Sequence, residues 1–376
     1  MKFRVDRDVL ADAVTWTART LPQRPPAPVL SGVLIRSEDE STISLATFDY
    51  EVSARASVAA EASEQGTILV SGKLLAEISR SLPNKPVEIT TEGTKATVVC
   101  GSSRFTLLTM PVDEYPSLPE LPELIGSIDS EEFTHAVQQV SIAASKDDTL
   151  PLLTTVRIEV SGDKITLLAT DRYRLALREV SWQPAKPDLE TSALVRARTL
   201  SESAKSFSSS GRVEIGLQTG AGVNRIGFLA GGRVTTSQLE DGDYPHVRRL
   251  FPESTPIQAV VETAPLIEAA KRVALVAERN SPIRLSFSEG QVVLDAGQGD
   301  DAQASEAIEA TLSGEDISVA FNPHYLLDGL SVLGTPYVRL GFTHPNKPVE
   351  FIGQRTETGE TLDEYRYLLV PIRFTS

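Results

Sequence analysis

The residue types that catalysis uses most often are few in this chain, and their spacing does not suggest a reaction. The chain has four histidines and one cysteine, Cys100, and no histidine lies at metal-ligand spacing from that cysteine. DDTLP and EDGD place carboxylates close together, but their composition is typical of surface turns rather than of a magnesium site. No serine has a histidine and a carboxylate at a spacing that indicates nucleophilic catalysis. The sequence therefore predicts no catalytic residues, no bound metal and no cofactor.

Two glycine-containing stretches have some likeness to phosphate-binding loops. They are TGAGVN, which begins at Thr219, and GQGDD, which begins at Gly297. Neither opens a helix after a strand or carries the lysine that contacts phosphate, so both are predicted to be hairpin turns. An enzyme built from repeated domains, such as a transferase with its site between domains, stays open as an alternative, although no convergent polar cluster supports it.

Composition limits the compartment and the partners. The 376 residues are 41% hydrophobic and 23% charged, an ordinary balance for a globular protein. The formal net charge of -15 argues against holding nucleic acid by bulk electrostatic attraction. One cysteine excludes a disulfide within the chain and fits a reducing compartment. There is no run of about 18 apolar residues, and Met1 leads directly into KFRVD, so we expect a cytoplasmic protein with no membrane contact.

The elements that must position any site occur in three copies. VDRDVLADAVTWTARTL, from Val5, returns as IDSEEFTHAVQQVSIAA from Ile128 and as VETAPLIEAAKRVALVA from Val261. Two later blocks follow in the same order: ISLATFD, ITLLATD and VVLDAGQ, then VSGKLLAEI, VRARTLSES and FNPHYLLDG. A period of about 125 residues is long enough for each copy to hold its own core.

Each copy is predicted to be an α+β domain. The first block has apolar residues at helical spacing, the second alternates like a strand, and the third is a shorter helix, predicted at residues 72–82, 198–207 and 323–333. Proline-rich joints at Tyr115–Ser127 and Leu250–Pro256 separate the copies. The predicted domains are residues 1–122, 123–253 and 254–376.

Beyond the repeat, three motifs carry a resemblance to a known family. They are LATDRYRLA (Leu168–Ala176), DGDYPHVRRLFP (Asp241–Pro252) and LLVPIRF (Leu368–Phe374). In order and over the whole chain they resemble the bacterial DNA polymerase III beta subunits, the sliding clamps. The resemblance implies three tandem clamp domains per chain and a ring-shaped homodimer of six domains, with helices lining a central hole and sheets outside.

The resemblance also implies the function, which is that of a non-catalytic processivity factor. The ring would encircle double-stranded DNA, slide freely and tether the replicative DNA polymerase catalytic subunit. Other implied partners are the clamp loader, other polymerases, and mismatch-repair or ligase proteins that carry clamp-binding peptides. A scaffold or ligand-binding protein that never encircles DNA is the alternative. Particle size, together with retention on circular but not linear DNA, would separate a clamp from both alternatives.

Domain size agrees with such a ring. Domains of this length have centres roughly 30 Å apart, so six of them leave a hole of roughly 30 Å. A duplex on the order of 20 Å across passes through that hole with room for water. A closed ring is held by topology, so an acidic exterior is compatible with it and reduces nonspecific binding to nucleic acid.

The residues that would contact DNA follow from the resemblance. An arginine in the loop after the first helix touches DNA in the family, and Arg24 stands at the matching place. Basic residues of the second helices are further candidates; they are Lys73, Arg196 and Arg198. The segment Asp129–Asp147 is acidic and breaks this basic trend.

A partner-peptide groove is implied between the middle and last domains. Aliphatic residues beside a proline turn leave an apolar cleft that an extended peptide could enter with its Leu or Phe anchors, while arginines at the rim fix its backbone. Arg172-Tyr173 replaces the Gly-His common in the family, and Val370 and Ile372 replace two methionines, which makes the wall less adaptable. The matching positions are Leu153, Thr170, Arg172, Tyr173, Arg174, Leu175, Pro245, Leu250, Leu368, Val370, Pro371, Ile372 and Arg373.

The dimer interface is expected at an edge strand. SRFTLL (Ser103–Leu108) is predicted to expose Phe105 and Leu107 on one face, with Arg104 beside them. An exposed apolar edge promotes aggregation unless another strand pairs with it. By the resemblance this strand pairs with the last domain of the second copy, near the helix that carries Leu275.

Overall fold

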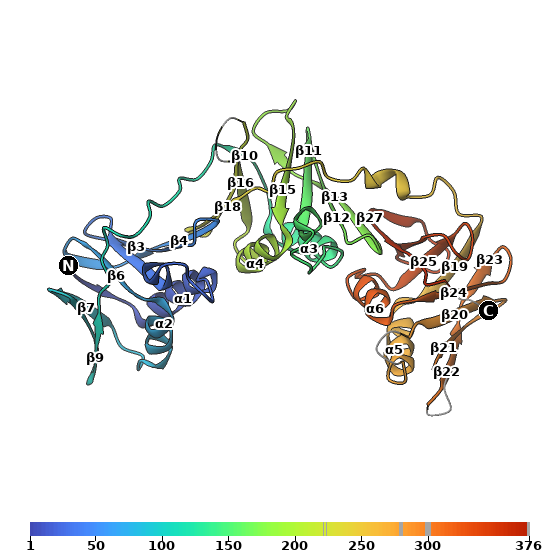
Figure 1. The fold of residues 1–376 in the computed structure, drawn as a ribbon, viewed down its shortest axis with the longest axis horizontal. Coiled ribbons are helices and arrows are strands. Elements are labelled where there is room, and N and C mark those ends of the chain that lie inside the picture. Colours follow the sequence, from blue (N-terminus) through green and yellow to red (C-terminus); the bar gives the residue numbers. More distant parts are fainter. Residues whose placement is uncertain (221, 223, 278–280, 298–301, 374–376) are drawn as a thin grey trace. The chain divides into compact units, whose positions relative to one another are not determined.

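The structure is a computed structural model that describes residues 1–220, 222, 224–277, 281–297 and 302–373 (Figure 1). Parts of both glycine-containing loops, and Phe374 of the terminal motif, lie outside the described residues. No helix in the described ranges is both long enough and apolar enough to span a bilayer.

The described residues form two compact units. Unit 1 comprises the described residues of Met1–Glu131, Gln183–Lys186 and Glu202–Leu239. Unit 2 comprises Glu132–Trp182, Pro187–Ser201 and the described residues from Glu240 onward. These units do not follow the three predicted domains, and the boundaries at residues 122 and 253 stay a prediction.

Unit 1 contains a five-stranded and a nine-stranded antiparallel sheet. The first has the order β5-β1-β7-β8-β9 and the second the order β14-β10-β16-β17-β18-β4-β3-β2-β6. Its helices are α1 (Arg7–Thr17) and α2 (Gly72–Ser81). The strands are β1 (Lys2–Val5), β2 (Gly32–Ser37), β3 (Thr42–Phe48), β4 (Val52–Ala59), β5 (Glu61–Glu64), β6 (Thr67–Ser71), β7 (Val87–Glu92), β8 (Lys95–Cys100), β9 (Ser103–Leu108), β10 (Leu124–Asp129), β14 (Gln183–Pro184), β16 (Arg212–Gln218), β17 (Arg225–Ala230) and β18 (Arg233–Gln238).

Unit 2 also contains a nine-stranded antiparallel sheet, here beside a four-stranded one. Their orders are β15-β11-β12-β13-β27-β26-β25-β19-β23 and β22-β21-β20-β24. Helix α5 (Thr263–Ala274) packs against β21 and β22, and α6 (Pro323–Ser331) packs against β27. The strands are β11 (Thr155–Ser161), β12 (Lys164–Thr170), β13 (Arg174–Ser181), β15 (Glu190–Arg196), β19 (Ile257–Glu262), β20 (Ile283–Ser288), β21 (Gln291–Ala296), β22 (Ala304–Glu309), β23 (Thr311–Ser313), β24 (Ile317–Phe321), β25 (Tyr337–Phe342), β26 (Val349–Gln354) and β27 (Thr361–Leu369).

Four short 3-10 helices and two further helices complete the described elements. Helices α3 (Ser130–Ser141) and α4 (Ala197–Phe207) each have residues in both units. The 3-10 helices are η1 (Ala18–Thr20), η2 (Pro28–Ser31), η3 (Pro151–Thr154) and η4 (Val247–Leu250).

The helix signals in the sequence have clear physical causes in the structure. Asp6 caps α1, because its carboxylate accepts hydrogen bonds from the backbone N–H groups of Asp8 and Val9. Asn322 caps α6 in the same way, with Pro323 in the first turn. Helix α5 starts at Thr263, and its N-cap Glu262 forms no capping hydrogen bond with its side chain.

Both nine-stranded sheets join segments that the repeat assigns to different copies. In unit 1, β4 of the first copy pairs antiparallel with β18 of the second. In unit 2, β13 of the second copy pairs antiparallel with β27 of the third. The candidate groove is built on this second junction.

Candidate partner-binding groove

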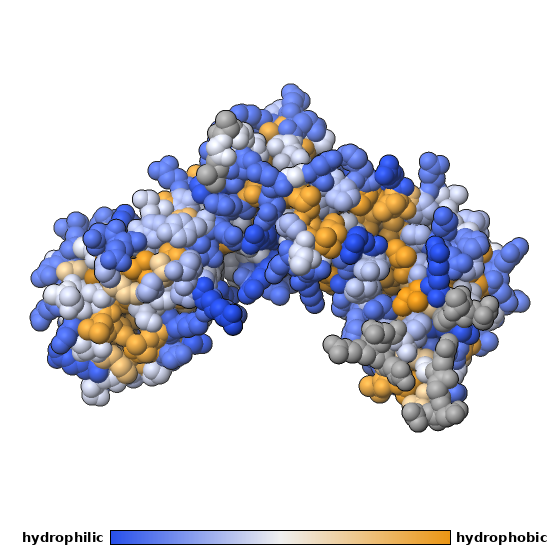
Figure 2. All heavy atoms as spheres, viewed as in Figure 1, coloured by the Kyte–Doolittle hydropathy of each residue, from blue (hydrophilic) through white to orange (hydrophobic). Residues whose placement is uncertain are grey.

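A cluster of buried apolar residues forms the floor of the candidate groove, entirely within unit 2. It lies where β12, β13 and β27 run side by side and where the segment before η4 folds back onto them. On the visible face of unit 2, apolar residues gather over the region of β13 and β27 (Figure 2). The cluster consists of Leu168, Leu175, Leu177, Leu194, Tyr244, Val247 and Leu368, with Leu152 and Phe251 packed against it.

Exposed apolar side chains are concentrated beside this cluster. Tyr173 is 54% exposed, Leu250 53%, and Val370 and Ile372 38% each. Among the large hydrophobic residues that the structure describes as exposed in unit 2, only Leu275 is not a predicted groove residue. Several exposed apolar groups next to one buried apolar floor make a surface suited to a protein partner.

The tail that follows β27 is held along the turn between β12 and β13. The backbone N–H of Val370 donates to the carbonyl of Tyr173 over 2.9 Å, and that of Ile372 donates to Ala320 over 2.7 Å. Pro371, between them, is buried. These bonds fix the tail while Val370 and Ile372 keep their side chains accessible.

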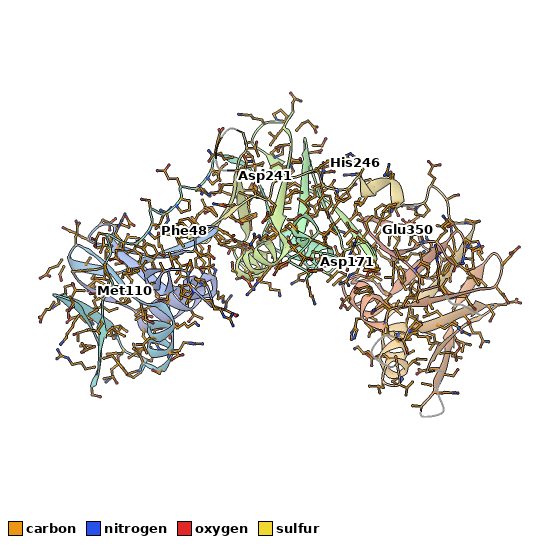
Figure 3. All side chains as sticks on the ribbon, viewed as in Figure 1. Phe48, Met110, Asp171, Asp241, His246 and Glu350 are labelled. Atoms are coloured by element: carbon orange, nitrogen blue, oxygen red, sulfur yellow. The ribbon has the colours of Figure 1, made fainter. Side chains whose placement is uncertain are left out.

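The turn from Thr170 to Arg174 is organised by its own side chains. Asp171, labelled in Figure 3, accepts hydrogen bonds at Oδ1 from the N–H groups of Tyr173 and Arg174. Thr170 Oγ1 accepts from the N–H of Arg172 over 3.1 Å and donates to the carbonyl of Arg174 over 2.7 Å. Arg172 has a φ of 80°, a left-handed conformation that is uncommon for a residue other than glycine.

Arg174 is a structural residue of the site and not a free rim charge. Its side chain is 4% exposed and pairs with Asp171 over 3.0 Å and with Asp328 of α6 over 2.7 Å. The guanidinium lies 4.2 Å from the ring centroid of Tyr325, and Tyr325 in turn stacks with Tyr173 at 6.2 Å and 27°. This network fixes the exposed Tyr173 ring against α6.

A second network holds the segment after η4 against the sheet. The guanidinium of Arg366 lies 4.3 Å from the ring centroid of Phe251, and its Nε donates to Glu350 over 2.6 Å. Glu350 is 5% exposed, and burial raises the pKa of its carboxyl even though Arg366 opposes that shift. Tyr244 is also buried at the floor, and burial raises the pKa of its hydroxyl to about 12, so it stays neutral.

The structure places all of the predicted groove residues in unit 2, in two groups. Six are buried, of which Leu175 and Leu368 belong to the floor and Thr170 and Arg174 to the network of the turn: Leu153, Thr170, Arg174, Leu175, Leu368 and Pro371. Seven are exposed: Arg172, Tyr173, Pro245, Leu250, Val370, Ile372 and Arg373.

Sequence reasoning missed the residues that support the groove from other segments. Tyr325 and Asp328 lie in the repeated block FNPHYLLDG, which was interpreted only as a helix. Phe251 lies inside the DGDYPHVRRLFP motif, from which only Pro245 and Leu250 are predicted to line the groove. Arg366 and Glu350 gave no local signal, because their ion pair joins neighbouring strands of the sheet.

The basic residues proposed for DNA contact are exposed. Arg24 lies in the loop between η1 and η2, and Lys73 lies in the first turn of α2, both in unit 1. That loop starts beside α2, since a Cβ on Gly72 would lie 2.5 Å from Leu21 Cδ1. In unit 2, Arg198 lies in the first turn of α4 and Arg196 pairs with Glu240 over 2.6 Å.

The residues proposed for the dimer interface differ in exposure. On the edge strand β9, Arg104 is exposed and Phe105 is 37% exposed, but Leu107 is 4% exposed and belongs to the core of unit 1. Leu108 is the more accessible leucine, at 72%. Leu275 follows the last residue of α5 and is 84% exposed.

Family models match three consecutive segments of the chain. Their descriptions are the DNA polymerase III beta subunit N-terminal domain for residues 1–119, its central domain for residues 127–246, and its C-terminal domain for residues 248–362.

Curated relatives and solved structures agree with these matches. The beta sliding clamp of Streptomyces coelicolor is 57% identical over 376 residues, with 100% of both chains covered. That of Micrococcus luteus is 58% identical over 312 residues, which are 83% of this chain and 100% of the relative. A crystal structure of the Pseudomonas aeruginosa DNA polymerase III beta subunit has a TM-score of 0.90 at 30% identity, with both chains fully covered. A second Pseudomonas aeruginosa clamp structure, bound to griselimycin, has a TM-score of 0.91 at 29% identity.

Proposed function

Because the chain belongs to the DNA polymerase III beta subunit family, we propose that it is a sliding clamp, which encircles duplex DNA and tethers the replicative polymerase to it. The prediction of an α+β fold with three tandem clamp domains is confirmed by the three family matches. The expected function is likewise that of relatives that match the whole chain.

Enclosure explains how an acidic protein stays on DNA. With a net charge of -15, bulk attraction to phosphate is weak, whereas a closed ring of two copies holds the duplex by topology. We assign the mild positive potential of the hole to Arg24, Lys73, Arg196 and Arg198. Tight phosphate contacts would impede sliding, so few basic side chains are needed. The protein acts as a cytoplasmic accessory factor of the polymerase and not as the catalyst.

The observation that carries the tethering role is the group of exposed apolar side chains around the floor at Leu175 and Leu368. An extended peptide can place Leu or Phe anchors on this floor while its backbone runs beside the tail at Val370. Such peptides would come from the polymerase catalytic subunit, the clamp loader, other polymerases, and mismatch-repair or ligase proteins.

Ring closure is assigned to the edge strand β9. Its unpaired edge and its exposed Phe105 and Leu108 side chains favour pairing with a strand of a second copy, with Leu275 as the apolar counterpart. Arg104 adds a charge to the same edge. Leu107 is buried in the core of unit 1 and is not assigned to the interface.

The test is topological. The labelled protein is loaded by a clamp loader onto nicked circular DNA, separated from free protein by gel filtration, and then followed after a restriction enzyme cuts the circle. We expect co-elution with the circle and release after cutting, and we expect bulky blocks on both DNA ends to restore retention. A variant with Phe105→Asp and Leu108→Asp should run as a monomer near 40.7 kDa and should not be retained. Retention on unblocked linear DNA would refute enclosure.

A further inference from the structure

The backbone of Arg172 is the starting observation. Among the described residues other than glycine, only Tyr50 and Arg172 have positive φ values, of 75° and 80°. A left-handed arginine is strained, because its Cβ crowds the neighbouring carbonyl, and glycine would relieve that strain. Strain of this kind persists where the surroundings enforce it.

The surroundings do enforce it. The N–H of Arg172 is held by Thr170 Oγ1, and the next two N–H groups are held by Asp171 Oδ1. The Arg172 side chain is left exposed, directly before Tyr173, whose carbonyl accepts the bond from the tail at Val370. Arg172 therefore stands at the rim of the groove, one residue from an exposed apolar contact.

The charges near Arg172 leave room for another carboxylate. Asp171 and Asp328 are both engaged by Arg174. Hydrogen bonds from Thr149 hold the pKa of Asp147 below its ordinary value, and the charge of Arg172 contributes to that shift in smaller part. Even so, no carboxylate in the part of the chain that the structure describes lies within ion-pair distance of Arg172. Arg249 of η4, next to the predicted groove residue Leu250, is a second exposed positive charge.

We propose that Arg172 is a specificity residue of the groove, which selects partner peptides that carry a carboxylate side chain next to an apolar anchor. This inference rests on the proposed tethering function. A glycine would give the same turn with less strain, so the arginine is best explained by what its side chain contacts. Its charge complements an acidic residue, and the adjacent Tyr173 and Val370 fit the apolar anchor beside that residue.

The test uses labelled eight-residue peptides that carry Leu and Phe anchors and a single Asp moved through the other positions, each paired with its Asn twin. Fluorescence anisotropy measures their affinity for the full-length protein at low salt. We expect Asp to be favoured over Asn by about 2- to 5-fold at one position, as for an exposed ion pair, and the preference to shrink at high salt. In Arg172→Gln and Arg172→Gly the ratio of Asp-peptide to Asn-peptide affinity at that position should fall to about 1, whatever change either variant makes to the affinity that the two twins share.

Two variants separate the effect of the Arg172 charge from the effect of its backbone strain. Arg172→Gly should also raise the melting temperature, whereas Arg172→Gln keeps the strained backbone and should not. Tyr50→Gly, at the other position with a positive φ, should leave every peptide affinity unchanged. A preference for Asp that survives in both Arg172 variants, or no preference in the unmodified protein, overturns the inference but not the tethering function. If none of the peptides binds, the tethering function fails and the inference fails with it.

Discussion

Two hairpins of this chain are copies of each other, and they differ in the pair of strand residues beneath the turn. The turn between β3 and β4 lies in unit 1, and the turn between β12 and β13 lies in unit 2. In each, an aspartate precedes a left-handed residue: Asp49 before Tyr50, and Asp171 before Arg172. Each aspartate accepts hydrogen bonds from the N–H groups two and three residues later. The turn geometry is therefore a property of the repeated fold and not of one function.

The difference between the hairpins lies in the strand pair beneath each turn. In unit 1, Ser53 of β4 faces Thr236 of β18, and their buried hydroxyls bond to each other over 2.7 Å. In unit 2, the equivalent Leu175 of β13 faces Leu368 of β27. The two hydroxyl groups satisfy each other by hydrogen bonding and present no apolar surface to a peptide anchor, whereas a leucine pair presents apolar surface. One fold thus makes two equivalent junctions that differ in chemistry, with a hydroxyl pair beneath the first turn and a leucine pair beneath the second.

Arg174 should give the largest effect that separates the two hairpins. Arg174→Ala leaves the nearly buried Asp171 carboxylate unpaired and removes the support under Tyr325, so we expect a loss of about 3–5 kcal/mol in unit 2. The equivalent Val52→Ala in unit 1 removes only a half-buried methyl pair and should cost about 1 kcal/mol or less. Hydrogen–deuterium exchange of peptides covering each hairpin measures the two effects separately.

Similar hydrogen–deuterium exchange for the two substitutions would contradict the proposed difference between the hairpins. Equal acceleration of exchange in both hairpins would mean that Arg174 is dispensable and that the turn holds itself through Asp171 and Thr170 alone. An additional Asp171→Asn change in the Arg174→Ala background should recover part of the loss, because the unpaired buried charge is then gone.

The sequence predicts those parts of the site that depend on residues close together in the chain, and not those that depend on contacts between distant segments. The helix and strand periodicity of the repeated blocks and the positions of the groove motifs follow from residues close together in the chain. The support from Tyr325 and Asp328 could not be predicted, because it depends on how α6 packs against a turn about 150 residues earlier.

The edge strand β9 shows the other limit of sequence reasoning. Its alternating pattern predicted that Phe105 and Leu107 share a face, but alternation does not say how far each position is covered. The structure buries Leu107 and leaves Leu108 exposed. Local periodicity also does not predict which strands of different copies pair. The pairing of β4 with β18 and of β13 with β27 nevertheless forms both junctions.

Tyr173 should give an intermediate effect, seen in binding rather than in stability. Tyr173→Ala removes an exposed aromatic contact beside the groove, so we expect affinity for an anchor peptide to fall about 10- to 30-fold. Tyr50, 51% exposed, is its counterpart in unit 1 and packs against Phe48. Tyr50→Ala should leave affinity unchanged, and both variants should lose about 1 kcal/mol of stability or less. If Tyr50→Ala weakened binding as much as Tyr173→Ala, peptides would not distinguish the two junctions.

The smallest expected effect is the titration of Asp147, which reports on the charge of Arg172 directly. Its carboxylate accepts hydrogen bonds from the side chain and backbone of Thr149, and these lower its pKa, with Arg172 adding the weakest contribution. Asp39 of unit 1 is the matched control, since its pKa is lowered by the backbone and side chain of Ser41. A lowered carboxyl pKa stabilises the fold above its unfolded value, and that stabilisation is lost as pH falls through the folded pKa.

Carbon NMR of the two carboxyl groups distinguishes these contributions. Thr149→Val should raise the pKa of Asp147 most, Arg172→Gln should raise it less, and neither should move Asp39. A bound peptide whose carboxylate pairs with Arg172 should act in the same direction as Arg172→Gln, because it neutralises the same guanidinium. If the Asp peptide left the pKa of Asp147 unmoved, or moved it no more than its Asn twin did, the peptide carboxylate would lie elsewhere on the rim, and Arg249 would become the residue to test.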